Sequence, residues 1–388
     1  MDLKPLSFNS GLERYEKQAE DLLAALRGRD AKAIDVFRRH PRFLDKKIPW
    51  LSTNPSDEEV VAAGLALPDA RLAVARLHDF RDWPALVQFV EAVTRDGSPV
   101  ARFEAAVEAV IDGDIATLSS MLREDPALVR ARSKRVTHFD PPVHRATLLH
   151  YVAANGVEGY RQRTPANAVE VAKMLLDGGA EVDALADLYG QGCTTMSLLV
   201  SSCHPAEAGL QIPLAHLLLD YGASIEGDGS GKWSSPLMTA LAFGYTKTAE
   251  ALAERGGRTD SLPAAAGLGR LDEARRLLRS ADAEARHKAM ALAAQHGHGD
   301  VVKLLLDAGE DPNRYNPEGN HAHSTPLHQA VYAGHVDVVR LLVEGGARLD
   351  VKDTVYHSTP LGWATYCKQT EIEKYLRSLD EGRRVGRE

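Results

Sequence analysis

The sequence has 388 residues, 44% hydrophobic and 26% charged, a composition typical of folded globular proteins rather than of disordered chains. Its formal net charge is -8, from 46 basic and 54 acidic side chains, which argues against nucleic acid as a partner. The N-terminal stretch lacks the apolar core of a signal peptide, and no window approaches the roughly 18 apolar residues of a membrane span. We therefore expect a cytoplasmic protein that does not bind membranes.

Residues 1–96 show helical apolar periods without a regular repeat. The most regular of these stripes consists of Leu72, Val74, Leu77, Phe80, Trp83, Leu86 and Phe89. Such a stripe marks a buried helix face more often than a ligand site. Residues 97–143 contain the stretch FEAAVEAVIDGDIATLSSMLREDPALV, which is typical of a degenerate helix pair. We therefore predict an N-terminal helical region over 1–96 that caps the chain, followed by a first helix pair over 97–143.

A regular repeat follows from residue 144. The segments STPLHQAVYAGHVDVVRLLVEGGARLD and STPLGWATYCKQTEIEKYLRSL place Thr325 and Thr359 at the same point of two helix pairs, 34 residues apart. Threonine before proline starts a helix, and Gly345 with Gly346 supplies the left-handed backbone that ends one. Because a lone pair cannot bury its apolar stripe, such pairs must stack. This pattern resembles the ankyrin repeat, which implies an all-α solenoid with short β-hairpin fingers.

Seven such pairs are expected over residues 144–380, with a polar tail over 381–388. Their first helices are placed to start near residues 147, 194, 235, 260, 288, 325 and 359. Between the two helices of the first pair, residues 156–167 contain eleven residues more than the regular repeat, and residues 201–211 of the next pair contain seven more. Long loops within a repeat are usually functional or disordered, and the glycine and proline content here favours an ordered turn. The two insertions either plug the edge of the repeats or form a ligand or partner site.

Two longer segments resemble a group of bacterial ankyrin-repeat proteins. These are DARLAVARLHDFRDWPALVQFVE and HRATLLHYVAANGVEGYRQRTPANAVEVAKMLLDGGAEVDA. The resemblance implies the fold and a bacterial cytosolic setting, and it implies no particular activity. Asp79 departs from the group, which more often has glycine at this position, so the resemblance leaves the end of that helix in doubt.

The loops between repeats contain the predicted partner-binding residues. They read LADLYGQGCTT, GDGSGKWSS, RYNPEGNHAHS and KDTVYHS, and each contains one aromatic residue: Tyr189, Trp233, Tyr315 and Tyr356. In the fold that this sequence resembles, such loops face the concave groove where protein partners bind, and exposed aromatics supply much of the binding energy at interfaces. The alternative is that these rings pack on neighbouring loops.

Histidine and cysteine give no metal or cofactor site. His296 and His298, like His321 and His323, have a two-residue spacing but lack a third ligand at zinc spacing. His150, like its counterpart in the later repeat, occupies the TPLH position, where we expect a structural bond to backbone. The three cysteines show no CxxC pairing and are expected to be buried thiols: Cys193, Cys203 and Cys367.

An enzymatic site remains an alternative. Eight residues of the first two repeats could converge on one pocket: His144, His150, Glu158, Tyr160, Arg161, Asp187, Tyr189 and His204. They would supply an acid or base, an orienting carboxylate and an anion-binding arginine. However, the sequence contains no nucleophile elbow, phosphate loop or dinucleotide fingerprint. The favoured hypothesis is therefore a non-catalytic scaffold without a cofactor that binds a protein partner through its concave groove and fingers. A small-molecule binding protein or enzyme built on the first two repeats is the alternative.

Overall fold

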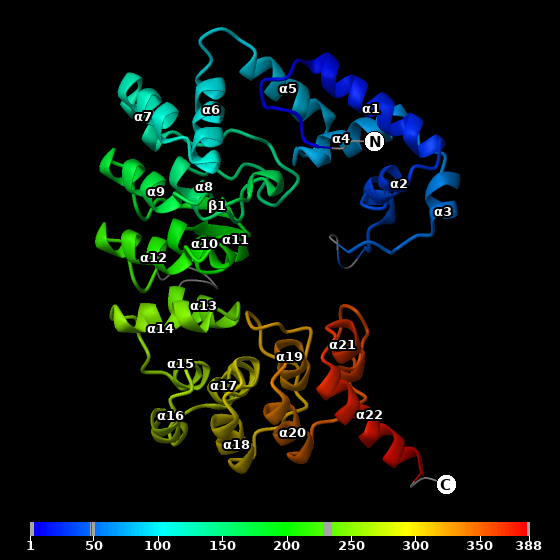
Figure 1. The fold of residues 1–388 in the computed structure, drawn as a ribbon, viewed down its shortest axis with the longest axis vertical. Coiled ribbons are helices and arrows are strands. Elements are labelled where there is room, and N and C mark those ends of the chain that lie inside the picture. Colours follow the sequence, from blue (N-terminus) through cyan, green and yellow to red (C-terminus); the bar gives the residue numbers. More distant parts are fainter. Residues whose placement is uncertain (1–3, 47, 49–50, 228–234, 386–388) are drawn as a thin grey trace. The chain divides into compact units, whose positions relative to one another are not determined.

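The computed structural model describes residues 4–46, 48, 51–227 and 235–385 (Figure 1). The chain divides into two units, residues 1–221 and residues 222–388, which are described one at a time below. Among the described residues, no helix combines the length and the apolar character needed to cross a bilayer.

The first unit begins with helices packed around their own core. They are α1 (Leu12–Arg27), α2 (Ala31–Phe37), η1 (Pro41–Phe43), α3 (Asp57–Ala62), α4 (Leu67–Leu77) and α5 (Trp83–Val93). Polar side chains begin several of these helices, since Asp30, Ser56 and Asp82 each accept a backbone N–H of the first turn. Of the predicted aromatic stripe, Phe80 and Phe89 lie in the buried core, which agrees with a packing role.

Helix pairs complete the first unit. They are built from α6 (Pro99–Asp112), α7 (Ile115–Glu124), η2 (Pro126–Arg130), α8 (Leu148–Val152), η3 (Gly159–Arg161), α9 (Ala168–Asp177), α10 (Thr195–Leu199), α11 (Cys203–Glu207) and α12 (Gln211–Asp220). Thr147 and Thr194 stand at the N-caps of α8 and α10, where the sequence predicts them. The helices of successive pairs contact each other: α6 packs on α8 and α8 on α10, while α7 packs on α9 and α9 on α12.

One loop of this unit forms a β-hairpin. Strand β1 (Ala186–Leu188) pairs antiparallel with β2 (Gln191–Cys193), with Ala186 opposite Cys193. The two turn residues, Tyr189 and Gly190, both have a positive φ, of 53° and 74°. Two consecutive left-handed residues are the mark of the tight turn that suits the twist of a two-stranded hairpin.

The later loops do not follow the hairpin prediction. Residues 311–324 and 350–358 contain no strand, and the backbone bonds across each loop include only single links such as Asn316 to Ser324 (2.8 Å) and Asp353 to Ser358 (2.9 Å). In the last loop the carboxylate of Asp353 accepts the backbone N–H groups of Val355, Tyr356 and Ser358. These side-chain bonds satisfy the amides that a strand ladder would otherwise use.

The described residues of the second unit form five helix pairs. They are α13 (Pro236–Ala242) with α14 (Thr246–Glu254), α15 (Leu262–Gly267) with α16 (Leu271–Leu278), α17 (Ala283–His296) with α18 (Gly299–Asp307), α19 (Pro326–Ala333) with α20 (Val336–Glu344), and α21 (Pro360–Tyr366) with α22 (Thr370–Val385). The first helices contact one another in sequence order from α13 to α21, and the second helices do so from α16 to α22. Stacking of this kind buries the apolar stripes that no single pair can cover.

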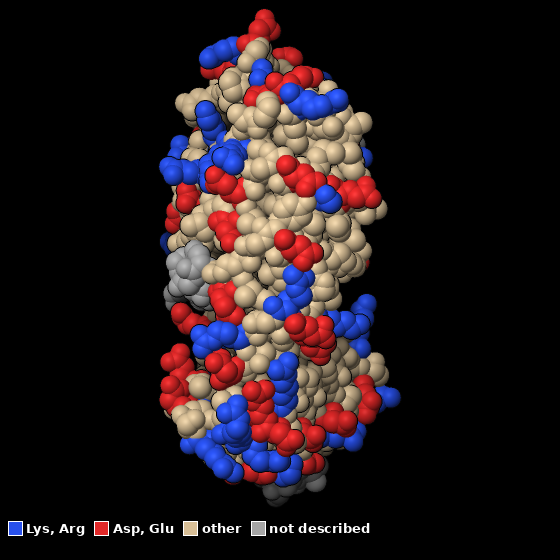
Figure 2. Space-filling view, turned by 90° about the vertical axis from the view of Figure 1, so that its left-hand side faces the viewer, with Lys and Arg blue, Asp and Glu red and all other residues tan. Residues whose placement is uncertain are grey.

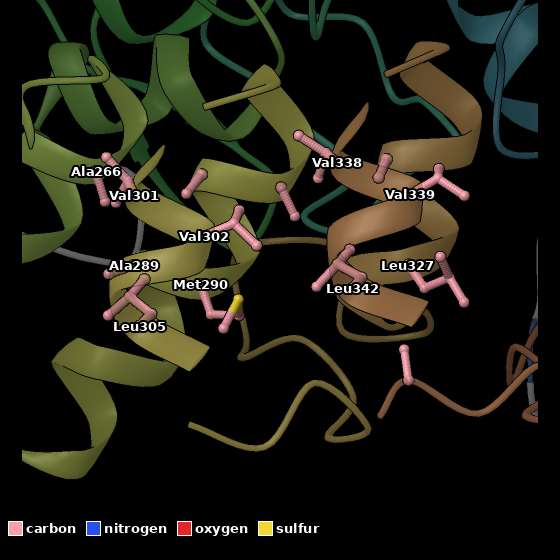
Figure 3. Packing of buried hydrophobic residues seen from close by; sticks show 14 of the residues in the cluster. Ala266, Ala289, Met290, Val301, Val302, Leu305, Leu327, Val338, Val339 and Leu342 are labelled. Atoms are coloured by element: carbon pink, nitrogen blue, oxygen red, sulfur yellow. The ribbon is translucent and has the colours of Figure 1, made fainter. Parts of the chain in front are cut away.

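Small and branched side chains fill the core between these pairs. Figure 3 shows Val301, Val302 and Leu305 of α18 packed beside Ala289 and Met290 of α17. Across the next interface, Leu327, Val338, Val339 and Leu342 continue the same core into α19 and α20. Alanine on the first helices permits this close approach because it adds little side-chain volume.

The start of α17 differs from the prediction. The sequence places it near residue 288, whereas the helix begins at Ala283 with the Asp282 carboxylate accepting the N–H of Ala285 (2.8 Å). Residue 288 therefore lies in the second turn of α17. The aspartate cap and the uninterrupted helix-forming residues behind it extend the helix upstream, so that the loop before it is short.

Histidines join neighbouring repeats within the second unit. The Nε2 atoms of His298 and His335 each donate to a backbone carbonyl of the preceding repeat, at Gly267 (2.9 Å) and Gln295 (3.0 Å). His296 makes a similar bond to Leu241 (2.8 Å). Each bond fixes the ring by its Nε2 atom and links helix pairs of the stack. Among the described residues, no group of three His, Cys, Asp or Glu residues could hold a metal ion.

Candidate functional site

The first insertion turns its arginine into the protein interior. Arg161 has 0% of its surface exposed and lies between carboxylates of α6 and of the insertion itself. Its Nη1 atom lies 2.7 Å from Glu104 Oε2 and 3.7 Å from Glu158 Oε2, and its Nη2 donates to Glu108 Oε1 at 2.7 Å. These carboxylates hold the pKa of Arg161 well above its usual value although burial opposes the charge. The guanidinium is therefore already paired inside the fold.

A second buried arginine completes this charge cluster. Arg135 donates from Nε to Glu104 Oε2 (3.0 Å) and lies 3.7 Å from Glu158 Oε1. Its guanidinium lies over the rings of Phe89, at 4.2 Å from the ring centre, and of Phe80, at 4.9 Å. Burial alone would raise the pKa of Glu158, but the two arginines outweigh it and lower that pKa. We call Glu104, Glu108, Arg135, Glu158 and Arg161 the buried charge cluster.

The insertion also binds the N-terminal helices through Asp79. The N–H of Gly159 donates to Asp79 Oδ2 at 2.7 Å. Asp79 has a φ of 61°, a left-handed conformation that glycine adopts without strain, and it lies two residues after the end of α4. Burial and the nearby Glu158 carboxylate raise the pKa of Asp79 to about 6. Asp79 therefore interacts with the insertion by a hydrogen bond and by charge, although Gly159 lies 80 residues later in the sequence.

The remaining contacts of the two insertions are also internal. Arg163 pairs with Asp112 (2.5 Å), and the Asn167 side chain donates to the carbonyl of Gly113 (2.8 Å), so that the first insertion follows α6 along its end. In the second insertion, residues Cys203–Glu207 form α11, and the Gln211 amide that follows donates to the carbonyls of Leu199 and Ser202.

The eight residues of the enzymatic alternative occupy different surroundings. Glu158, Tyr160 and Arg161 lie together at the buried charge cluster, where Arg161 is 5.5 Å from the Tyr160 ring centre. Both ring nitrogens of His150 are hydrogen-bonded: Nδ1 accepts the backbone N–H of Thr147, and Nε2 donates to the carbonyls of Ala184 and Cys193. His144 bonds Thr137 and interacts electrostatically with both Glu158 and Asp187. The other three have partners or surroundings of their own: Asp187 pairs with Arg145, Tyr189 bonds Asn155, and His204 lies half-buried in α11.

A cavity of about 670 Å³ lies in the second unit, on α19, α21 and the loops that precede them. We call it the aromatic cavity, and it is lined by His321, His323, Gln329, Tyr332, Tyr356, Ser358, Trp363, Tyr366 and Cys367. Three of its tyrosines are widely exposed: Tyr332 by 62%, Tyr356 by 66% and Tyr366 by 87%. Exposed aromatic rings around a hollow are unusual on a surface without a binding role.

Trp363 organises the aromatic cavity. Its ring lies 6.0 Å from the ring of His323 and 6.1 Å from that of Tyr332, measured between centres. Its indole Nε1 donates to Asp353 Oδ2 at 3.0 Å. Burial would raise the pKa of Asp353, but the bonds from the Tyr356 amide and the indole lower it, so the carboxylate is charged at neutral pH. The tryptophan is thereby held in one orientation beside a negative charge.

Neutral histidines form another wall. Burial lowers the pKa of both His321 and His323 below the ordinary value for histidine. The His321 Nε2 donates to the carbonyl of Ala242 at 3.0 Å, which ties this loop to the end of α13. The walls of the cavity are therefore uncharged at pH 7.

Of the four predicted partner-binding aromatics, one lines this cavity. Tyr356 does so, while Tyr315 is 40% exposed and donates to the carbonyl of Lys352, and Tyr189 is 61% exposed on the hairpin of the first unit. Trp233 lies outside the described residues. Sequence reasoning missed Tyr332, Trp363 and Tyr366, although bulky rings in short, otherwise small-residue helices could have indicated them.

Charged side chains of both signs are mixed on one face of the protein. On the face shown in Figure 2, basic and acidic side chains alternate, and neither sign forms a continuous field. A mixed surface of this kind does not concentrate a polyanion such as nucleic acid.

Comparison with known proteins gives a family match in the second unit. A model of ankyrin repeats (three copies) matches residues 292–386. The mouse protein "Ankyrin repeat and SAM domain-containing protein 6" is 38% identical over 101 residues, which cover 26% of this chain and 11% of that protein. The crystal structure of the human ASB11 ankyrin repeat domain is 20% identical with a TM-score of 0.36, covering 70% of this chain and 95% of that one. The chain therefore contains ankyrin repeats, a generic protein-interaction module.

Proposed function

We propose that this chain binds a protein partner through the aromatic cavity. The observation that carries the proposal is the exposure of Tyr332, Tyr356 and Tyr366 around a hollow that is also lined by Trp363, whose indole is hydrogen-bonded to Asp353. Interfaces gain most of their energy from a few aromatic or arginine anchors that enter well-formed pockets. Because the cavity is already formed, less conformational entropy is lost when a partner binds.

We propose that the two insertions are structural. The support is the burial of Arg161 among carboxylates and the internal bonds of Asp79 and Gln211. A ligand-binding arginine needs free donors towards solvent, whereas this one is fully buried and paired. In this proposal residues 1–96 cap a repeat solenoid over 144–380, and the bacterial chain works as a non-catalytic scaffold in the cytoplasm.

Selection from a displayed random-peptide library on the full chain tests the proposal. Selected peptides should bind the wild type and bind the double variant Tyr356→Ala/Tyr366→Ala at least about 10-fold more weakly, because each exposed anchor contributes about 1 kcal/mol or more. Tyr189→Ala is the matched control, since it removes a ring of similar exposure from the other unit.

The outcome locates the binding surface. If selected peptides bind the double variant normally but no longer bind Tyr189→Ala, the binding surface lies in the first unit and the proposal is contradicted. Circular dichroism should show the same helix content for all variants, because each substituted ring is more than 60% exposed.

A further inference from the structure

The walls of the aromatic cavity favour a positively charged guest. Four aromatic rings line it, from Tyr332, Tyr356, Trp363 and Tyr366, and no Lys, Arg, Asp or Glu is among its lining residues. The face of an aromatic ring carries negative electrostatic potential and attracts cations, most strongly for tryptophan. In a partly desolvated hollow this attraction exceeds its value at a flat surface.

The surrounding chain adds no competing charge. Residues 319–336 and 354–367, which contribute all the lining residues, contain no Lys, Arg, Asp or Glu. Lys368 follows Cys367 but does not line the cavity. The lining residues therefore include no Lys or Arg that could occupy the site itself or repel a bound cation.

One negative charge lies at the edge of the tryptophan ring. Asp353 is 1% exposed and accepts the indole N–H of Trp363 at 3.0 Å. A carboxylate bonded to the indole nitrogen raises the electron density of the ring, and its own charge attracts a cation bound near the ring. All of its bonds described above come from neutral donors, so its charge is not cancelled by an ion pair among them.

We propose that the aromatic cavity binds an arginine side chain of the partner protein. This inference rests on the proposed function and names the chemistry of the same site. Arginine fits better than lysine because its planar guanidinium stacks on rings and is more weakly hydrated than an ammonium group. The volume of about 670 Å³ also leaves room for residues next to the arginine, as expected for a segment of polypeptide.

Three short peptides separate charge from shape. We would titrate the full chain with N-acetyl-Ala-Ala-Arg-Ala-Ala-amide, with its citrulline counterpart and with its lysine counterpart. Citrulline keeps the length and planarity of arginine and removes the charge. Binding is followed by the indole N–H resonance of Trp363, assigned with Trp363→Phe. The arginine peptide should bind about 3- to 30-fold more tightly than the citrulline peptide, and more tightly than the lysine peptide.

Matched variants localise the effect. Tyr332→Leu and Tyr356→Leu keep an apolar side chain but remove a ring, so each should reduce the preference for arginine over citrulline. Phe243→Leu removes a ring that is 43% exposed in the same unit and outside the cavity, and it should leave the preference unchanged.

The possible results distinguish this inference from the proposed function. Equal binding of arginine and citrulline peptides would overturn the cation site and leave peptide binding intact. Tighter binding of lysine than of arginine would also overturn it. Absence of a saturable shift with all three peptides at about 10 mM overturns the inference, because a site of this kind should reach millimolar affinity. The proposed function itself fails only if the displayed peptides do not depend on Tyr356 and Tyr366.

Discussion

Removal of Arg161 should destabilise the first unit strongly. The variant Arg161→Ala leaves Glu104 and Glu158, both almost fully buried, with Arg135 as the cation that still contacts them. Breaking a buried ion pair by removing one partner costs about 3–5 kcal/mol, and here two buried carboxylates would be left to share the single guanidinium of Arg135. We therefore expect the free energy of unfolding of residues 1–221 to fall by about 3–5 kcal/mol at pH 7.5.

Hydrogen exchange of the full chain measures this loss where it occurs. Amide protection in α6, which contains Glu104 and Glu108, should fall by at least about 100-fold, the factor that corresponds to 3 kcal/mol. Protection in α19 and α21 should not change, because they belong to the other unit. The loss should shrink at pH 5, since the pKa of Glu158 rises once Arg161 no longer lowers it, and a protonated carboxyl tolerates burial.

Arg163→Ala is the matched control for this prediction. Arg163 belongs to the same insertion, but its side chain is 47% exposed and pairs with a half-exposed Asp112. Exposed ion pairs contribute about 0–1 kcal/mol, so α6 protection should change little. Equal, small effects of Arg161→Ala and Arg163→Ala would refute the reasoning that the buried charge cluster holds the first unit together.

Three further substitutions test other parts of the structure. Asp79→Asn should raise the free energy of unfolding by up to about 3 kcal/mol at pH 8 and change it little at pH 3, as measured by urea titration at both pH values. The reason is that the pKa of Asp79 is about 6 in the folded protein against 3.8 in the unfolded chain, so its ionisation destabilises the fold as pH rises between these values. Asp353→Asn should lower the exchange protection of α21 at neutral pH and have a smaller effect at acidic pH. Because the pKa of Asp353 is lowered in the folded protein, the stability that its carboxylate contributes is lost as pH falls, and equal effects at both pH values would contradict this. Gly113→Ala should destabilise the first unit by at least about 1 kcal/mol in the urea titration, since its φ is 71° and a Cβ would lie 2.1 Å from the Asn167 side chain, and an unchanged midpoint would contradict this.

Local signals in the sequence predicted much of the fold. Thr147, Thr194, Thr325 and Thr359 stand at the N-caps of the helices that they are expected to start. A cap is a property of a few adjacent residues, so one sequence is sufficient to locate it. Where the expected threonine is missing, as before α17, the predicted start was wrong by several residues.

The candidate site was harder to predict because burial is not a local property. Glu158 and Arg161 attract attention as charged residues in a loop, yet their partner Glu104 lies more than 50 residues earlier on another helix. A sequence does not show that these charges face one another in the interior. Tyr356 was found because it lies in a loop, whereas Tyr332 and Trp363 belong to helices, where the usual interpretation of an aromatic ring is core packing.

The buried charge cluster also determines where the chain can be cut. A fragment that starts at the first clear repeat, near residue 144, would keep Glu158 and Arg161 but lose Glu104, Glu108 and Arg135. In such a fragment Glu158 would be the one carboxylate left to pair with Arg161. We therefore expect the isolated repeats of this unit to be less stable than the same residues in the full chain. The segment before the repeats thus supplies two of the three carboxylates that pair with the arginine of the first insertion.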